Sequence, residues 1–202
     1  MTTPITSTAQ ALDAINAALL TANPALPGLG GMYTPSGALT GATNGHAEHL
    51  IVTVVSESFD VNDTNHHDAL DQALRDLSDM ARETHAVIEA LTLYQPDEDE
   101  DEDEDSTRPA LTVTQVLDLA NDALSDTQTS VCLDGMYTPD GVLTGEINGS
   151  AERLIATVIT EAHADTTPGN PLGRVISRLR RAYRAIDLAA DTIHGGHPRD
   201  DG

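Results

Sequence analysis

The chain has 202 residues, and its 33 acidic residues against ten arginines and no lysine give a formal net charge of −23. This charge argues against a protein that binds nucleic acid over its whole surface, because phosphate neutralisation requires a positive face. The single cysteine excludes a disulfide scaffold, and the absence of an apolar run of about 20 residues excludes a membrane-spanning protein. The first ten residues lack the basic and apolar regions of a secretory signal, so we expect a soluble, cytoplasmic protein.

An internal repeat organises the chain. Residues 31–45 read GMYTPSGALTGATNG and residues 135–149 read GMYTPDGVLTGEING, and 18 of 27 positions are identical between 31–57 and 135–161. Upstream, residues 9–19 match residues 114–124. A run of this kind rarely recurs by chance. The sequence therefore predicts two copies of one module of about 90 residues, at 1–95 and 110–197.

The segment between the copies is strongly acidic. Residues 97–105 read DEDEDEDED, and nine adjacent negative charges repel one another. We expect residues 96–109 to form a disordered linker and residues 198–202 a disordered tail. The modules carry the remaining charge of −14, so the acidity is not confined to the linker.

Each module is predicted to begin with a helix. Apolar residues at 11, 12, 15, 19 and 20 have helical spacing, and Thr8 is the expected N-cap. The second copy is expected to begin at Thr112 or Thr114 and to end at Leu124. Next, residues 34–37 (TPSG) and 138–141 (TPDG) have the pattern of a type I turn, which predicts a short β-hairpin.

The segment after each hairpin fits two kinds of secondary structure. Residues 50–56 (LIVTVVS) and 154–160 (LIATVIT) are rich in β-branched residues, as strands are. However, the apolar residues of 47–58 and 151–162 recur with the spacing of a helical stripe, which Ser150 would cap in the second copy. We favour helix. The strand alternative would give an α-β-β-β-α module.

Each module ends in an amphipathic helix, predicted at Asp68–Leu91 and at Leu172–Ile193. The expected fold is mostly α with short β-hairpins, built as a tandem duplication of a helix–hairpin–helix–helix module. The alternative is α+β. Because such a module is small and poor in aromatic residues, we expect the two modules to pair within the chain or across a homodimer.

The repeat contains polar residues that turn geometry and core packing do not require. A tyrosine ring, threonine hydroxyls and glycine amides are groups that bind a small polar ligand such as a nucleotide. The plainer interpretation, which we favour, is that the tyrosines cap a small core and the threonines fill the hairpin. The candidate ligand-binding residues are Tyr33, Thr34, Thr40, Glu48, Tyr137, Thr138, Thr144 and Glu152.

The two final helices differ in charge. The second carries an arginine stripe and the first carries acidic residues, which suggests that the helices pair, that the linker covers the stripe, or that the stripe contacts an anionic partner. Pairing is favoured. The candidate partner-binding residues are Arg174, Arg178, Arg181 and Arg184 in one helix and Asp71, Asp76, Asp79 and Glu83 in the other.

The sequence holds no convincing catalytic constellation. Carboxylates spaced as in Asp68 and Asp71, or Asp76 and Asp79, can share a divalent metal, but no second acidic helix completes such a site. The histidines match no zinc pattern. We expect no catalytic residue, no metal and no cofactor, and a metal-dependent hydrolase is a minority hypothesis.

These features favour a non-enzymatic acidic binding protein, such as a phage or mobile-element accessory protein that inhibits a host protein by nucleic-acid mimicry. The alternative is a protein that binds or sequesters a small, nucleotide-like ligand through the duplicated hairpins. A lesser alternative is a nucleic-acid binder that acts through the stripe Arg174–Arg184; nucleic acid is otherwise not expected as a partner, nor is a membrane.

Overall fold

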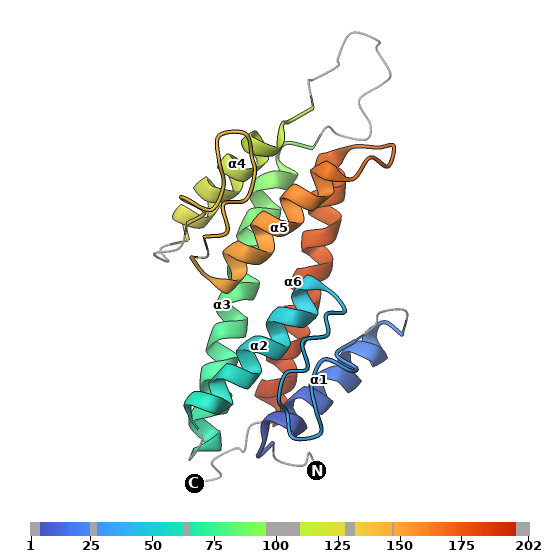
Figure 1. Ribbon diagram of the computed structural model, residues 1–202, viewed down its shortest axis with the longest axis vertical. Helices are drawn as coiled ribbons and strands as arrows, with labels where there is room; N and C mark the ends of the chain where they lie inside the picture. The colour runs from blue at the N-terminus through green and yellow to red at the C-terminus, as the bar shows by residue number, and fades with distance from the viewer. Residues whose placement is uncertain are drawn as a thin grey trace. The chain divides into compact units, whose positions relative to one another are not determined.

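A computed structural model describes residues 5–24, 28–62, 65–95, 110–127, 132–146 and 148–196. The predicted linker at 96–109 and tail at 198–202 lie outside these residues. Within them, the chain is mostly helical and contains no strand, only two isolated antiparallel bridges (Figure 1). The helices are α1 (Thr8–Ala22), α2 (His46–Val61), α3 (His66–Thr92), α4 (Val113–Ser125), α5 (Ser150–Ala164) and α6 (Pro171–Gly196).

The ambiguous segments are helices. Residues 47–58 lie in α2 and residues 151–162 lie in α5, so the α-β-β-β-α alternative is wrong. The β-branched composition would suit a strand, but the apolar residues fall on one helical face. Ile51 and Val55 in α2, and Ile155 and Ile159 in α5, have no exposed surface. Burial of this stripe outweighs the weaker preference of β-branched residues for strands.

Several helices begin at other residues than predicted. Ser7, not Thr8, caps α1, and its hydroxyl accepts a hydrogen bond from the backbone N–H of Gln10. Gly149, not Ser150, is the N-cap of α5. Of the final helices, α3 begins two residues before the predicted Asp68, and α6 begins one residue before the predicted Leu172. For α4 the structure selects Thr112, which forms a capping box with Gln115.

The described chain forms two compact units. Unit 1 comprises Met1–Ala81 and Ala182–Gly202, and unit 2 comprises Arg82–Arg181. In unit 1, α1 packs against α2, and in unit 2, α4 packs against α5 (Figure 1). Each unit also takes one part of α3 and one part of α6.

Each unit contains residues from both predicted sequence modules. In unit 1, the backbone N–H of Ile5 donates to the carbonyl of Gly196 over 3.5 Å. In unit 2, the Arg180 guanidinium donates to the Thr92 hydroxyl over 3.4 Å. The module boundaries at 95 and 110 follow the repeat in the sequence and stay a prediction, whereas the compact units follow packing.

The cores are aliphatic. In unit 1, Leu12, Ile15, Leu70 and Leu77 are essentially inaccessible to solvent. In unit 2, the same holds for Leu91, Leu117, Leu124, Val175 and Leu179. The apolar faces predicted for the final helices are therefore the buried faces, and they supply the hydrophobic term that stabilises a domain with few aromatic residues. No helix in the described ranges is apolar enough over a sufficient length to cross a membrane.

The cap of α4 gives a direct test of the local structure. Replacing Thr112→Ala removes the oxygen that accepts from Gln115 and should lower the free energy of unfolding by about 1 kcal/mol. Thr112→Ser keeps the hydroxyl and should retain most of that stability. Urea denaturation of the three proteins makes the comparison, and equal midpoints for Ala and Thr would show that the cap is not formed.

Candidate functional site

The repeated motif forms a loop that is attached to the preceding helix. We call residues 28–45 the first bridged loop, because Tyr33 and Leu39 form its antiparallel bridge. The Tyr33 hydroxyl donates to Oδ1 of Asp13 on α1 over 2.7 Å. The backbone N–H of Leu29 donates to Oδ1 of Asn16, also on α1, over 2.7 Å. The side chains of α1 therefore fix both the beginning of the loop and its bridge.

Side chains within the loop satisfy its own carbonyl groups. The Asn44 amide donates to the carbonyls of Gly28 and Gly30 at 3.0 and 2.9 Å. The Thr40 hydroxyl donates to the carbonyl of Gly31 at 2.7 Å. These bonds replace the ladder of hydrogen bonds that a regular strand pair would supply, so the loop keeps a fixed shape without one.

The predicted turn is closed as expected. In the first loop, the N–H of Gly37 donates to the carbonyl of Thr34 over 2.8 Å, and the Thr34 hydroxyl accepts from the N–H of Ala38. Gly37 has a φ of 89°, and a Cβ there would lie 2.6 Å from the Cβ of Thr8. Glycine is required at this position by both conformation and space.

The second bridged loop (residues 132–146, 148 and 149) repeats these contacts. It is bridged by Tyr137 and Leu143, and α4 takes the place of α1. The matching hydrogen bonds are Tyr137 to Asp118 (2.7 Å), Leu133 N–H to Asn121 (2.6 Å), Thr144 to Gly135 carbonyl (2.6 Å), Asn148 to the Cys132 and Asp134 carbonyls (2.8 and 2.9 Å), and Val142 N–H to Thr138 (3.1 Å).

Most of the predicted ligand-binding residues therefore make internal contacts. The hydroxyls of Tyr33 and Thr40, and of their second-copy partners, donate to acceptors of the same loop and helix. The acceptors and amides that hold the loops, Asp13, Asn16 and Asn44, were not among the predicted site residues. Their identity in both copies was the signal that could have found them. Ligand binding by the hydroxyl residues stays a prediction.

Glu48 and Glu152 are buried in the first turns of α2 and α5, with 5% and 3% of their surface exposed. Each carboxylate lies so close to the helix N-cap that a Cβ on Gly45 or Gly149 would collide with it. Burial raises the pKa of Glu152, and a hydrogen bond from its own backbone N–H partly offsets the effect. The positive end of the helix dipole favours a carboxylate here, so both residues have a structural role at the helix start.

Two of the four stripe arginines hold a loop in unit 2. The Arg174 guanidinium donates to the carbonyls of Ala162, Asp165, Thr167 and Gly169 at 2.9–3.3 Å. Arg178 donates to Oδ2 of Asp165 over 2.6 Å. The pKa of Asp165 is lowered by hydrogen bonds from Thr167 and, less strongly, by these two arginines.

The remaining stripe arginines, Arg181 and Arg184, are exposed on α6.

The predicted acidic residues of α3 differ in exposure. Asp79 is exposed and Asp71 and Asp76 are half-buried, whereas Glu83 retains only 5% of its surface. The first three belong to unit 1 and Glu83 to unit 2. The acidic face of α3 is therefore made by the exposed Asp79 and the half-buried Asp71 and Asp76, without Glu83.

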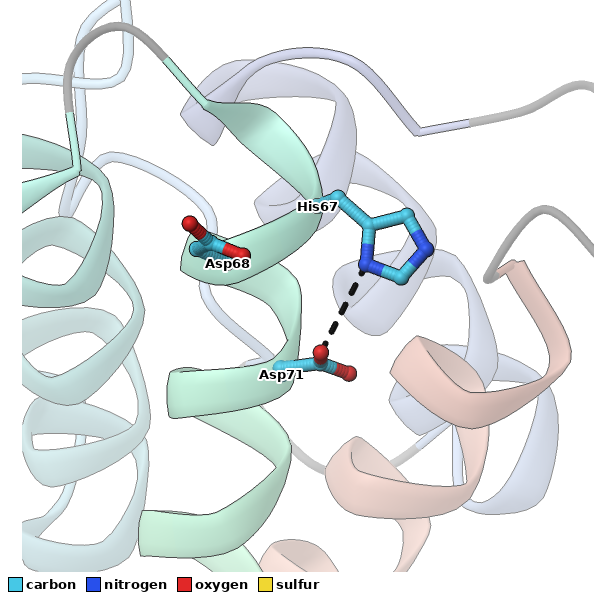
Figure 2. A group of neighbouring side chains, drawn as sticks. All are labelled: His67, Asp68 and Asp71. Atoms are coloured by element: carbon cyan, nitrogen blue, oxygen red, sulfur yellow. Dashed lines mark ion pairs between the residues drawn. The ribbon is translucent and has the colours of Figure 1, made fainter.

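The start of α3 brings together one histidine and two aspartates (Figure 2). Ligand atoms of His67, Asp68 and Asp71 all lie within 4.8 Å of one another, and His67 Nδ1 is 3.5 Å from Asp71 Oδ2. Asn65 donates to Asp68 over 2.7 Å and accepts from the His67 N–H. These bonds are those of a helix N-terminus, which accounts for the arrangement. Asp76 and Asp79 are not part of the group.

A shallow pocket of about 210 Å³ lies between the second bridged loop and α5. Apolar and polar side chains both line it, and the polar ones include a glutamate and an arginine. None of these residues was singled out from the sequence, because a pocket depends on how the loop packs on the helix. The lining residues are Met136, Leu143, Gly145, Glu146, Arg153, Ala156 and Thr157.

Comparison of the chain with protein-family models, with curated proteins and with solved structures found no match. Functional assignment therefore rests on the residues themselves.

The tyrosine–aspartate pairs predict a loss of stability at alkaline pH. Burial, the hydrogen bond to Asp13 and the charge of that carboxylate raise the pKa of Tyr33 above its usual value of 10.0, and Asp118 does the same for Tyr137. The unfolded chain then loses these protons first, so the free energy of unfolding should fall as the pH rises above about 10. Tyr33→Phe with Tyr137→Phe should reduce this fall, as measured by urea denaturation between about pH 8 and pH 11.

The same double variant also loses two hydrogen bonds and should be less stable than the parent by about 1–3 kcal/mol at neutral pH. Tyr94→Phe changes an exposed tyrosine and is the control. An alkaline slope that is the same in the double variant and the parent would contradict the assigned hydrogen bonds.

The stripe arginines should differ in how much they contribute to the free energy of unfolding. Arg174→Ala leaves four carbonyl acceptors without their donor and should lower the free energy of unfolding by about 1–3 kcal/mol. Arg181→Ala, on the exposed surface of the same helix, should change it by no more than about 0.5 kcal/mol. Thermal unfolding of both variants tests the difference, and similar losses would refute the role given to Arg174.

Proposed function

We propose that this chain is a non-enzymatic binding protein whose acidic surface docks on a basic surface of another protein. The charge balance carries the proposal. Among the described residues of unit 1, nine carboxylate side chains besides the buried Glu48 are accompanied by only two arginines, Arg75 and Arg184. One of these, Arg75, donates to Gln72. A surface of this kind attracts cationic partners strongly.

The physical advantage of such a surface lies in association. Complementary fields raise the rate at which two proteins meet and exclude partners of the same sign. A basic groove that normally holds nucleic acid is the best-matched target, because it already binds a dense line of negative charge. The chain would then act as a nucleic-acid mimic, in the manner of an accessory protein from a phage or mobile element that inhibits a host protein.

The tandem organisation belongs to the same proposal. The identity of 18 positions in 27, and the matching hydrogen bonds of the two bridged loops, support duplication of a helix–hairpin–helix–helix module. The two copies have kept the polar residues that hold the loops but differ in surface charge. This pattern is expected when one shared framework presents two different binding surfaces.

The alternative functions have weaker support. Binding of a nucleotide-like ligand by the loop hydroxyls would require Tyr33 and Thr40 to give up their internal acceptors. Binding of nucleic acid by the arginine stripe would have to proceed without Arg174 and Arg178, which hold the loop that follows α5.

Capture by the immobilised full chain tests the proposal. Host lysate is first enriched on a cation-exchange resin for proteins with basic surfaces. The captured protein should be released when the ionic strength rises from about 0.05 M to 0.5 M, since salt shortens the range of these forces. Duplex DNA should compete with the chain for it. Capture that resists both salt and DNA would overturn the proposal.

A charge-neutral variant tests the acidic face of α3. Changing Asp71, Asp76 and Asp79 to Asn should reduce capture several-fold. The matched control neutralises three exposed carboxylates of unit 1 elsewhere, through Glu57→Gln, Asp60→Asn and Asp191→Asn. Both variants change the net charge equally, so equal capture by the two would show that the α3 face is not the contact.

A further inference from the structure

The pocket of unit 2 opens on a surface that combines exposed aliphatic side chains with carboxylates. Val142 is 61% exposed and Leu143 is 38% exposed, and Leu143 also lines the pocket. Both residues lie in the part of the second bridged loop that pairs with Tyr137. Single exposed aliphatic residues are common on protein surfaces, but Leu143 lines a pocket as well, and there it provides a place for an apolar side chain.

Four exposed carboxylates lie in the second bridged loop or on α4, the helix to which the loop is attached. Asp118 accepts from the Tyr137 hydroxyl, and Asp134 accepts from the Asn121 amide over 3.0 Å. Asp122 lies near enough for its charge to act on Tyr137 together with Asp118 and Asp134. The fourth is Glu146, which lines the pocket and whose Oε2 would lie 2.7 Å from a Cβ placed on Gly135. We call Asp118, Asp122, Asp134, Leu143 and Glu146, with the pocket, the pocket face.

The first copy lacks most of these features at the matching positions. Where the second copy has Asp122, Asp134 and Glu146, the first copy has Ala17, Gly30 and Ala42.

The pocket itself also differs. Ala156 corresponds to Val52, whose side chain carries two more methyl groups and is fully buried. Since both copies keep the residues that hold the loop, the framework does not require the differences.

We propose that the pocket face binds a short basic segment of a partner protein, which inserts one aliphatic side chain into the pocket. The inference rests on the proposed function in one respect, namely that the partner is basic. Charge selects the occupant. Glu146 lines the pocket with Arg153, the single cation in that lining, and three further carboxylates lie around Tyr137 and Asn121. The volume of the pocket limits the size of the group that enters it. A volume of about 210 Å³ equals roughly seven waters at ~30 Å³ each, which suits one side chain.

A defined probe tests the inference without knowledge of the natural partner. The probe is a fluorescein-labelled peptide with one Leu between two pairs of Arg, and its binding to the full chain is followed by fluorescence anisotropy. A second peptide replaces the Leu by Gly, and a third replaces each Arg by Gln. The first peptide should bind several-fold more tightly than either of the others.

Substitutions toward the first copy locate the binding. Asp122→Ala with Glu146→Ala should weaken binding about tenfold, at roughly threefold for each lost charge. The matched control, Glu57→Ala with Asp60→Ala, removes two exposed carboxylates from unit 1 and should change binding less than about twofold.

Ala156→Val fills the pocket with the residue of the first copy and should abolish the advantage of the Leu peptide. Arg153→His at about pH 8 removes the opposing charge and should tighten binding about twofold.

Several results would overturn the inference: no binding of the Leu peptide, equal weakening by the two double variants, an unchanged Leu advantage in Ala156→Val, or weaker binding in Arg153→His. Circular dichroism checks that each variant is folded, and the surface double variant remains decisive if Ala156→Val is not. If these peptide tests fail while capture from lysate still responds to salt and DNA, the pocket face is rejected and the proposed function stands. If capture resists both, the proposed function itself fails.

Discussion

The attachment of each bridged loop to its preceding helix is the constraint on which the rest of the structure depends. The first bridged loop, residues 28–45, has one bridge, so its other polar backbone groups need other partners. Asn16 and Asn121 accept the backbone N–H of Leu29 and of Leu133, and Asp13 and Asp118 each accept a tyrosine hydroxyl. The loop thereby delivers the chain to the N-terminus of the next helix, where Glu48 or Glu152 is buried.

The helices could be predicted because their signals are local and periodic. The buried faces of α2, α3, α5 and α6 follow the apolar spacing of the sequence, and the TP-x-G turns follow their proline and glycine. The cap of α5 could not be predicted from Ser150, because the buried carboxylate of Glu152 lies against Gly149. Tertiary contact overrides local propensity at such a position.

The candidate site was less predictable than the fold. The tyrosines and threonines of the repeat stood out by their chemistry, yet their partners Asp13 and Asn16 lie on another element. Arg174 was one charge in a stripe by sequence, and only the path of residues 162–169 reveals its four carbonyl acceptors. The pocket could not be predicted from the sequence for the same reason, since Ala156 and Glu146 line one pocket only when the loop packs on α5.

A division of roles follows from these contacts. Polar residues that the two copies share form hydrogen bonds inside the loops and to the preceding helix, whereas several exposed residues that differ set the surface charge. Asp13 with Asp118 illustrates the first group, and Ala42 with Glu146 illustrates the second. Residues that bind a partner are therefore best sought among those that differ between the two copies, and residues that stabilise the loops among those that are identical.

Amide hydrogen exchange at Leu29 and Leu133 tests this account most directly. Both N–H groups should be protected in the parent, because each donates to an asparagine of the preceding helix. In Asn121→Ala, protection should be lost at Leu133 and retained at Leu29. Rapid exchange of both amides in the parent, or unchanged protection of Leu133 in the variant, would contradict the claim that the shared polar residues hold the loops.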